Sequence, residues 1–294
     1  MELIVIGNGF DLAHGLKSSY RAFGDYIEAN HPTFYTNLIS AFNNACGLWG
    51  NFENNLPLCG NEIENNGLQM MEERLQEIDY TPTDDEGIKY WLKKQYTFIH
   101  QLPVVLRKWA DSIWCTPIHR CYSSSLFTPD TKFLSFNYTQ TLEELYGIRR
   151  EQILHIHGFV GSSSKPLIMG HGNLRSIAYA KNYKAKADSQ ADSITAAVYA
   201  CVLEYLQYSY KDTVSIIAKN ASFFDGLDNV DEVKVIGCSL SKADEPYFTA
   251  IESKKPKHWT FYYHDDIHNY ELFVRKNAIS DSRYVFLPNK EIMN

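Results

Sequence analysis

The sequence lacks the features that would place a protein in a membrane. No apolar run approaches the roughly 20 residues of a membrane-spanning helix, and the apolar start, Met1–Ile6, is short and has no basic flank. We therefore expect a cytoplasmic protein without a membrane partner.

Cysteine pairs are missing too: none of the six cysteines forms a C-x-x-C motif, which argues against a structural zinc ribbon.

Basic charge is also scarce. The chain has 28 lysines and arginines against 35 acidic residues, a formal net charge of −7. The short clusters Lys181–Lys186 and Lys254–Lys257 fit solvated faces better than the basic stripe of a nucleic-acid-binding protein. The composition therefore argues against a nucleic-acid partner.

Short apolar runs predict the strands of a sheet. Leu3–Ile6 is continuously apolar and ends at a glycine, as in a strand that is buried on both faces. Tyr284–Leu287 precedes Pro288 and is expected at the sheet edge. The other runs are Lys132–Phe136, Ile153–Ile156, Val233–Ile236 and Trp259–Tyr263. The pattern predicts an α/β fold with a Rossmann-like, mainly parallel sheet.

Helical spacing of apolar residues fills the long intervals between these runs. The first interval lies between about Tyr20 and Pro129, and Asp84 and Asp85 are candidate caps for a helix within it. Pro103 and the Asn- and Gly-rich stretch Asn54–Gly67 are expected to interrupt the helical structure of this interval. The apolar side of that helix would carry Ile88, Trp91, Leu92, Tyr96 and Ile99. A second tract, about Asp188–Phe224, would carry Ile194, Val198, Cys201, Val202, Tyr205 and Leu206 on one side.

The first two strand runs are separated by more than a hundred residues, too many for a standard strand–helix–strand unit. We therefore predict a single domain, residues 1–294, with helical insertions at about 20–130 and 174–226. A separate helical domain is the alternative.

The first candidate site follows the first strand, at Gly7-Asn8-Gly9-Phe10-Asp11. A G-x-G turn lets backbone N–H groups approach a phosphate, although tight strand-to-helix turns also need glycine without any ligand. A hydride-transfer fingerprint would have its third glycine at position 12, where this chain has Leu12. Asp11 can reach a ribose hydroxyl or cap the following helix.

The second candidate is Asn137, in the segment Phe136–Thr139 at the end of a predicted strand. Its amide can hold a ribose hydroxyl or a water molecule. The alternative is that Asn137 or Thr139 caps a helix over Thr141–Tyr146.

The third candidate is the pair His155 and His157, which strand alternation would place on one side, followed by Gly158. His157 at the strand end can act as a general base. Two histidines can also ligate a metal if His171 or His264 supplies a third ligand, but hydrogen-bonded histidines are more common.

A fourth candidate, Gly237-Cys238-Ser239, suits backbone contact with a nucleotide, or is a plain turn capped by Ser241 or Asp244. Arg150 and His155 also match a loose ribonuclease spacing. About one such match is expected by chance, and the pattern predicts a strand rather than a helix at His155.

Taken in order, these motifs resemble the sirtuin-like NAD-binding fold and, more closely, the AbiH family of bacterial abortive-infection proteins. The stretch Gly7–Leu16 with Ser18-Ser19-Tyr20 resembles the AbiH opening, and Phe136–Thr139 resembles its Asn-Tyr-Thr segment. Trp49-x3-Glu53 resembles a tryptophan–glutamate pair of that family. The zinc-ribbon cysteines of sirtuin deacylases are missing, which argues against an acyl-lysine peptide substrate.

The resemblance implies roles for the candidate residues. Asn137 would contact the nicotinamide-side ribose and His157 would be the general base. The nucleotide-binding residues would be Gly7, Asn8, Gly9, Phe10, Asp11, Gly158, Gly237, Cys238 and Ser239.

The function implied is cleavage of the nicotinamide–ribose bond of NAD⁺, without a metal, as an antiphage defence that depletes the nucleotide. Its activity would have to be kept off by the helical insertions or by assembly into a homo-oligomer. The alternatives are a non-catalytic sensor of NAD⁺ or ADP-ribose, a metal-dependent hydrolase and a ribonuclease.

Overall fold

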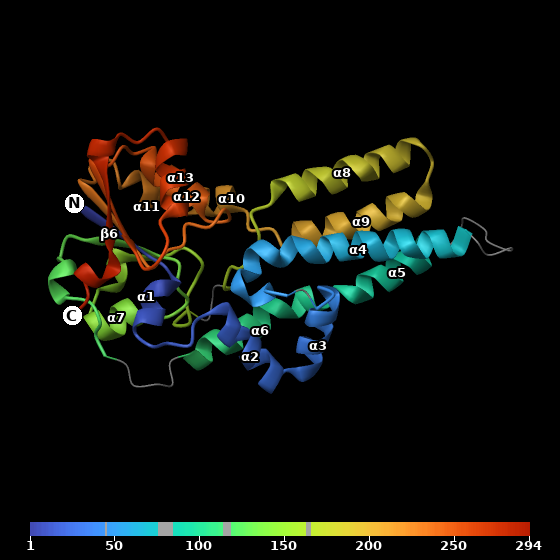
Figure 1. Cartoon of the computed structure of the whole chain (residues 1–294), viewed down its shortest axis with the longest axis horizontal. Helices are drawn as coiled ribbons and strands as arrows, with labels where there is room; N and C mark the ends of the chain where they lie inside the picture. The colour runs from blue at the N-terminus through green and yellow to red at the C-terminus, as the bar shows by residue number, and fades with distance from the viewer. Residues whose placement is uncertain (45, 76–84, 114–118, 163–165) are drawn as a thin grey trace. The chain divides into compact units, whose positions relative to one another are not determined.

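The structure is a computed structural model that describes residues 1–44, 46–75, 85–113, 119–162 and 166–294. The chain divides into two compact units, which we call the sheet unit and the helical unit. The sheet unit comprises Met1–Ser19, Leu106–Ile168 and Asp212–Asn294, and the helical unit comprises Tyr20–Val105 and Met169–Lys211. Both chain ends belong to the sheet unit (Figure 1).

Parallel strands form one six-stranded sheet in the order β3-β2-β1-β4-β5-β6. They are β1 (Glu2–Ile6), β2 (Lys132–Ser135), β3 (Ile153–His155), β4 (Glu232–Ile236), β5 (His258–Tyr263) and β6 (Tyr284–Pro288). All six predicted strands are confirmed, and β6 lies at the sheet edge. The order is that of a doubly wound nucleotide-binding sheet, whose topological switch point lies between β1 and β4.

Helices cover both faces of this sheet, which explains why Leu3–Ile6 of the central strand β1 is apolar on both sides. Leu3 and Val5 point to the face covered by α10, α11, α12 and α13, which we call the α12 face. Ile4 and Ile6 point to the face covered by α1 and α7, the α7 face. The helices are α1 (Asn8–Ala13), α7 (Thr141–Tyr146), α10 (Thr213–Lys219), α11 (Ala221–Asp225), α12 (Glu245–Glu252) and α13 (His268–Lys276). Short 3₁₀ helices are η3 (Ser124–Leu126), η4 (Arg150–Gln152), η5 (Asp281–Arg283) and η6 (Asn289–Glu291).

The helical unit is built around α9 (Ser193–Tyr208), whose predicted apolar side is confirmed as buried. Asp192 caps α9, because its carboxylate accepts the backbone N–H of Thr195 at 3.0 Å. Figure 1 shows α8, α9 and α4 side by side. The other elements are α2 (Tyr20–Asn30), α3 (Pro32–Ala41), η1 (Leu48–Gly50), α4 (Phe52–Leu75), α5 (Asp85–Gln95) and α8 (Leu174–Ser189). Helix α6 (Phe98–Ser112) continues from this unit into the sheet unit.

The expected interruption at Asn54–Gly67 is wrong, because this stretch lies inside the continuous helix α4. Its glycines allow close helix packing: a Cβ on Gly67 would lie 2.7 Å from the side chain of Val198 in α9, and one on Gly60 would lie 3.0 Å from Leu206. Pro103 likewise lies inside α6. Packing of a buried helix face outweighs the low helix propensity of glycine and proline here.

The predicted cap at Asp84 lies outside the described residues, and α5 begins at Asp85. Ile88 and Leu92 are buried as predicted, whereas Trp91 is 42% exposed. Within the described part of the chain, no helix combines the length and apolarity needed to cross a membrane.

Glu53 of the Trp49-x3-Glu53 motif belongs to a buried ion pair. The carboxylate of Glu53 lies 3.1 Å from the ammonium group of Lys211 and accepts the backbone N–H of Gly170 at 3.0 Å. Glu53 thereby ties α4 to both ends of the Met169–Lys211 segment. The ring of Trp49 packs against Gly24: a Cβ on Gly24 would lie 2.7 Å from the indole ring.

We expect Glu53→Gln or Lys211→Met alone to lower the free energy of unfolding by about 3–5 kcal/mol, because each leaves a buried charge unpaired. The double variant Glu53→Gln/Lys211→Met should lose less than either single variant. Urea unfolding of the four proteins measures this coupling. Additive losses would contradict the assignment of a buried ion pair.

Candidate functional site

The predicted site residues meet at one edge of the sheet, because the carboxyl ends of parallel strands share an edge. Gly7 follows β1, Asn137 follows β2, His157 follows β3 and Gly237 follows β4. The edge between β1 and β4 is where open α/β sheets bind their ligands.

Glycines join the turns after β1 and β4. The backbone N–H of Gly9 donates to the carbonyl oxygen of Gly237 at 2.8 Å, and that of Gly7 donates to Ile236 at 2.9 Å. A Cβ on Gly7 would lie 2.5 Å from the oxygen of Gly237, and one on Gly237 would lie 2.2 Å from the nitrogen of Phe10. These glycines therefore have a packing role that is independent of any phosphate. Asn8 and Ser239 are exposed beside them.

Asp11 is buried and anchors the segment that carries Asn137. Its carboxylate accepts the hydroxyls of Thr139 at 2.6 Å and Thr141 at 2.7 Å. Burial raises the pKa of Asp11 to about 6, against the lowering effect of these hydroxyl bonds. The side chain of Asn137 donates to the carbonyl oxygen of Gly7 at 3.1 Å.

The capping alternative for this segment is wrong. The residue that caps α7 is Gln140, and its side chain makes no capping hydrogen bond. The hydroxyl of Thr139 is directed to Asp11 instead. Asn137 and Thr139 thus serve the contact between β2 and the first turn rather than the start of a helix.

His157 faces Asp244, a residue that the sequence suggested only as a helix cap. Nε2 of His157 lies 3.6 Å from Oδ1 of Asp244, and the imidazole ring packs against the rings of Phe136 and Tyr247. Asp244 occupies the N-cap position of α12, as the sequence suggested, but its side chain makes no capping hydrogen bond. Only the three-dimensional structure reveals this pair, since the two residues lie 87 positions apart in the sequence.

The prediction that His155 and His157 lie on one side is wrong. Strand β3 ends at His155, so alternation does not extend to His157. Nε2 of His155 lies 3.0 Å from Glu143 of α7, and its Nδ1 lies 3.2 Å from the oxygen of Asn137. The ring of His155 therefore lies on the α7 face of the sheet, and the ring of His157 lies on the α12 face.

The other proposed metal ligands are engaged elsewhere. Nδ1 of His171 accepts the N–H of Asn173 and its Nε2 donates to Leu206, both at 3.0 Å; burial lowers the pKa of His171 to about 4. His264 is 84% exposed and pairs with Asp265. Within the ranges that the structure describes, no three or more His, Cys, Asp or Glu side chains form a possible metal site.

Arg150 and His155 are also explained by local packing. Both contact the carboxylate of Glu143, and the guanidinium of Arg150 lies 3.4 Å over the ring of Phe159. The side chain of His155 is only 2% exposed, so it has little access to an RNA phosphate.

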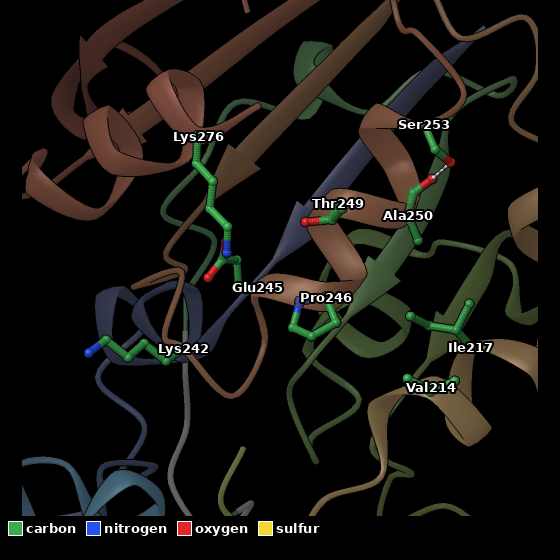
Figure 2. A pocket seen from close by; sticks show the side chains of 9 residues that line it. All are labelled: Val214, Ile217, Lys242, Glu245, Pro246, Thr249, Ala250, Ser253 and Lys276. Atoms are coloured by element: carbon green, nitrogen blue, oxygen red, sulfur yellow. Dashed lines mark hydrogen bonds and ion pairs between the residues drawn. The ribbon is translucent and has the colours of Figure 1, made fainter. Parts of the chain in front are cut away.

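A groove of about 480 Å³ lies between α10 and α12. Figure 2 shows Val214 and Ile217 of α10 across from Pro246, Thr249 and Ala250 of α12. None of the predicted site residues lines it.

Comparison with known proteins identifies one family. The model of the family described as "Bacteriophage abortive infection AbiH" matches residues 3–263. No match was found among curated proteins or among solved structures.

We expect Gly237→Ala to destabilise the fold by about 1–3 kcal/mol more than Gly147→Ala, the cost of overpacking. The two glycines share a positive φ, 65° and 67°, but a Cβ on Gly147 meets nothing within 4 Å. Gly147→Ala therefore measures the backbone strain alone. Equal losses in urea unfolding would contradict the contact between the two turns.

Asp11 should make stability fall as the pH rises. Its folded pKa of about 6 lies above the ordinary 3.8, so the folded state binds more protons between these values. The stability of the wild type relative to Asp11→Asn should drop by about 3 kcal/mol as the pH rises across that window, and stay constant above it. Urea unfolding as a function of pH measures this difference; a pH-independent difference would contradict it.

Proposed function

Because the chain belongs to the AbiH family of bacteriophage abortive-infection proteins, we propose that it acts in that defence by hydrolysing NAD⁺. The bond cleaved is the one between C1′ of ribose and nicotinamide. The observation that supports this proposal is the position of Asn137 and His157, which follow adjacent strands at the carboxyl edge of a doubly wound sheet.

Asn137 would position the ribose or the water. Its Nδ2 donates to the carbonyl oxygen of Gly7, which orients the amide and assigns Oδ1 as the acceptor for a ribose hydroxyl or the attacking water. Since the carboxylate of Asp11 fixes the segment that carries Asn137, this acceptor is held before substrate arrives.

His157 would accept the proton. The C1′–N bond breaks with its electron pair, which neutralises the pyridinium ring of the departing nicotinamide and leaves an oxocarbenium-like centre. Water attacks C1′ and gives its proton to His157, so the products are nicotinamide, ADP-ribose and a proton.

Burial suits this chemistry. Asn137 is 6% exposed and His157 5%, and Phe136 and Tyr247 pack against the imidazole. Polar groups that face a developing charge act more strongly when bulk water is excluded. NAD⁺ in this proposal is the substrate, and its phosphates would lie beside the two joined turns, where Asn8 and Ser239 are exposed.

We expect purified protein to release nicotinamide and ADP-ribose from NAD⁺, measured by mass spectrometry, and phage infection of cells that contain it to deplete NAD⁺. His157→Ala and Asn137→Ala should each lower the rate about 100-fold or more. His264→Ala, which changes an exposed histidine, is the matched control and should keep the wild-type rate.

Release that persists unchanged in both site variants would contradict the residue assignment. Binding of NAD⁺ without release, in extracts of infected cells as well as in buffer, would favour the sensor. Loss of protection in Arg150→Ala with NAD⁺ depletion intact would instead support RNA cleavage.

A further inference from the structure

Asp244 lies where it can control the imidazole of His157. Oδ1 of Asp244 lies 3.6 Å from Nε2 of His157, and its Oδ2 accepts the hydroxyl of Ser241 at 3.1 Å. The carboxylate makes no capping bond to α12, although Asp244 occupies the capping position. The carboxylate of Asp244 therefore contacts His157 and Ser241, which lie outside α12.

The surroundings restrict the ring of His157 to few orientations. The ring centroids of Phe136 and Tyr247 lie 5.2 and 5.6 Å from that of His157, both edge-on. The carbonyl oxygen of His157 accepts the N–H of Ile168 at 2.9 Å, and Gly158 follows with a φ of 80°. Packing limits rotation of the side chain, so Nε2 stays close to the carboxylate, which can then favour one of the two neutral tautomers of the ring.

We propose that Asp244 is the positioning residue of His157, whose ring it holds in the tautomer that carries its proton on Nε2. A carboxylate that faces one ring nitrogen favours a proton on that nitrogen and makes the other the acceptor. Nδ1 is then the basic atom. The same carboxylate stabilises the imidazolium that forms when the ring takes up a proton.

The role of base rests on the proposed NAD⁺ hydrolysis, but the tautomer does not. It can be read from the ¹⁵N chemical shifts of the imidazole in the free protein, with the His157 signals assigned by their loss in His157→Gln. We expect Nε2–H in the wild type, and a mixture or the Nδ1–H form in Asp244→Ala. Glu245→Gln removes the neighbouring carboxylate, which pairs with Lys276, and should leave the spectrum unchanged.

A wild-type ring protonated on Nδ1, or a His157 spectrum unchanged in Asp244→Ala, would overturn the proposal. Asp244→Asn keeps the side-chain shape, and serves if Asp244→Ala does not fold. In that variant the ring should lose its single tautomer or shift its ¹⁵N resonances.

Kinetics of nicotinamide release provide the second measurement. Both Asp244 variants should lower kcat about 100-fold with KM changed by less than about threefold, because the carboxylate acts on the base and not on the substrate. A wild type that releases no nicotinamide would count against the proposed function alone, since the tautomer is measured without NAD⁺. An active wild type whose Asp244 variants keep its kcat would overturn the positioning role.

Discussion

The contact between the turns after β1 and β4 is the constraint on which the site depends. Gly7, Gly9 and Gly237 bring two backbones so close that a single Cβ would collide with main-chain atoms. The contact closes the switch point of the doubly wound sheet and places the turn after β4 beside the first helix. Cys238 follows Gly237 in this contact and is buried, as close packing of the two turns requires.

The neighbouring segments are then held to this contact by polar bonds. Asn137 donates to Gly7, and Asp11 receives two hydroxyls from the segment that carries Asn137. The turn after β4 leads into Asp244, which faces His157 at the end of β3. Burial of Asp11 costs free energy at neutral pH, a cost that the surrounding hydroxyl bonds reduce. Fixed polar groups of this kind are typical of functional sites.

The sequence predicted the sheet well because each strand is a short, mostly apolar run with polar residues or glycine at its ends, a signal that depends on neighbouring residues alone. It failed where a partner lies far along the chain. The glycines in Asn54–Gly67 suggested a break, but the helix continues because Val198 and Leu206 pack against them. For the same reason no local pattern could reveal the ion pair of Glu53 with Lys211.

Within the site, the sequence identified the turns but not their contacts. It placed His155 beside His157 because alternation was extended past the end of β3. It suggested Asp244 as a helix cap, a position that Asp244 does occupy, but it did not reveal the contact of Asp244 with His157. The structure keeps Asn137 and His157 at the same edge of the sheet, and the proposed function requires both residues to act on one nucleotide.

The most direct test is a structure of the full-length His157→Ala variant, determined with NAD⁺. The account predicts uncleaved NAD⁺ at the carboxyl edge between β1 and β4, with its nicotinamide ribose within hydrogen-bonding distance of Asn137. Nucleotide bound elsewhere, for example in the groove between α10 and α12, would contradict it.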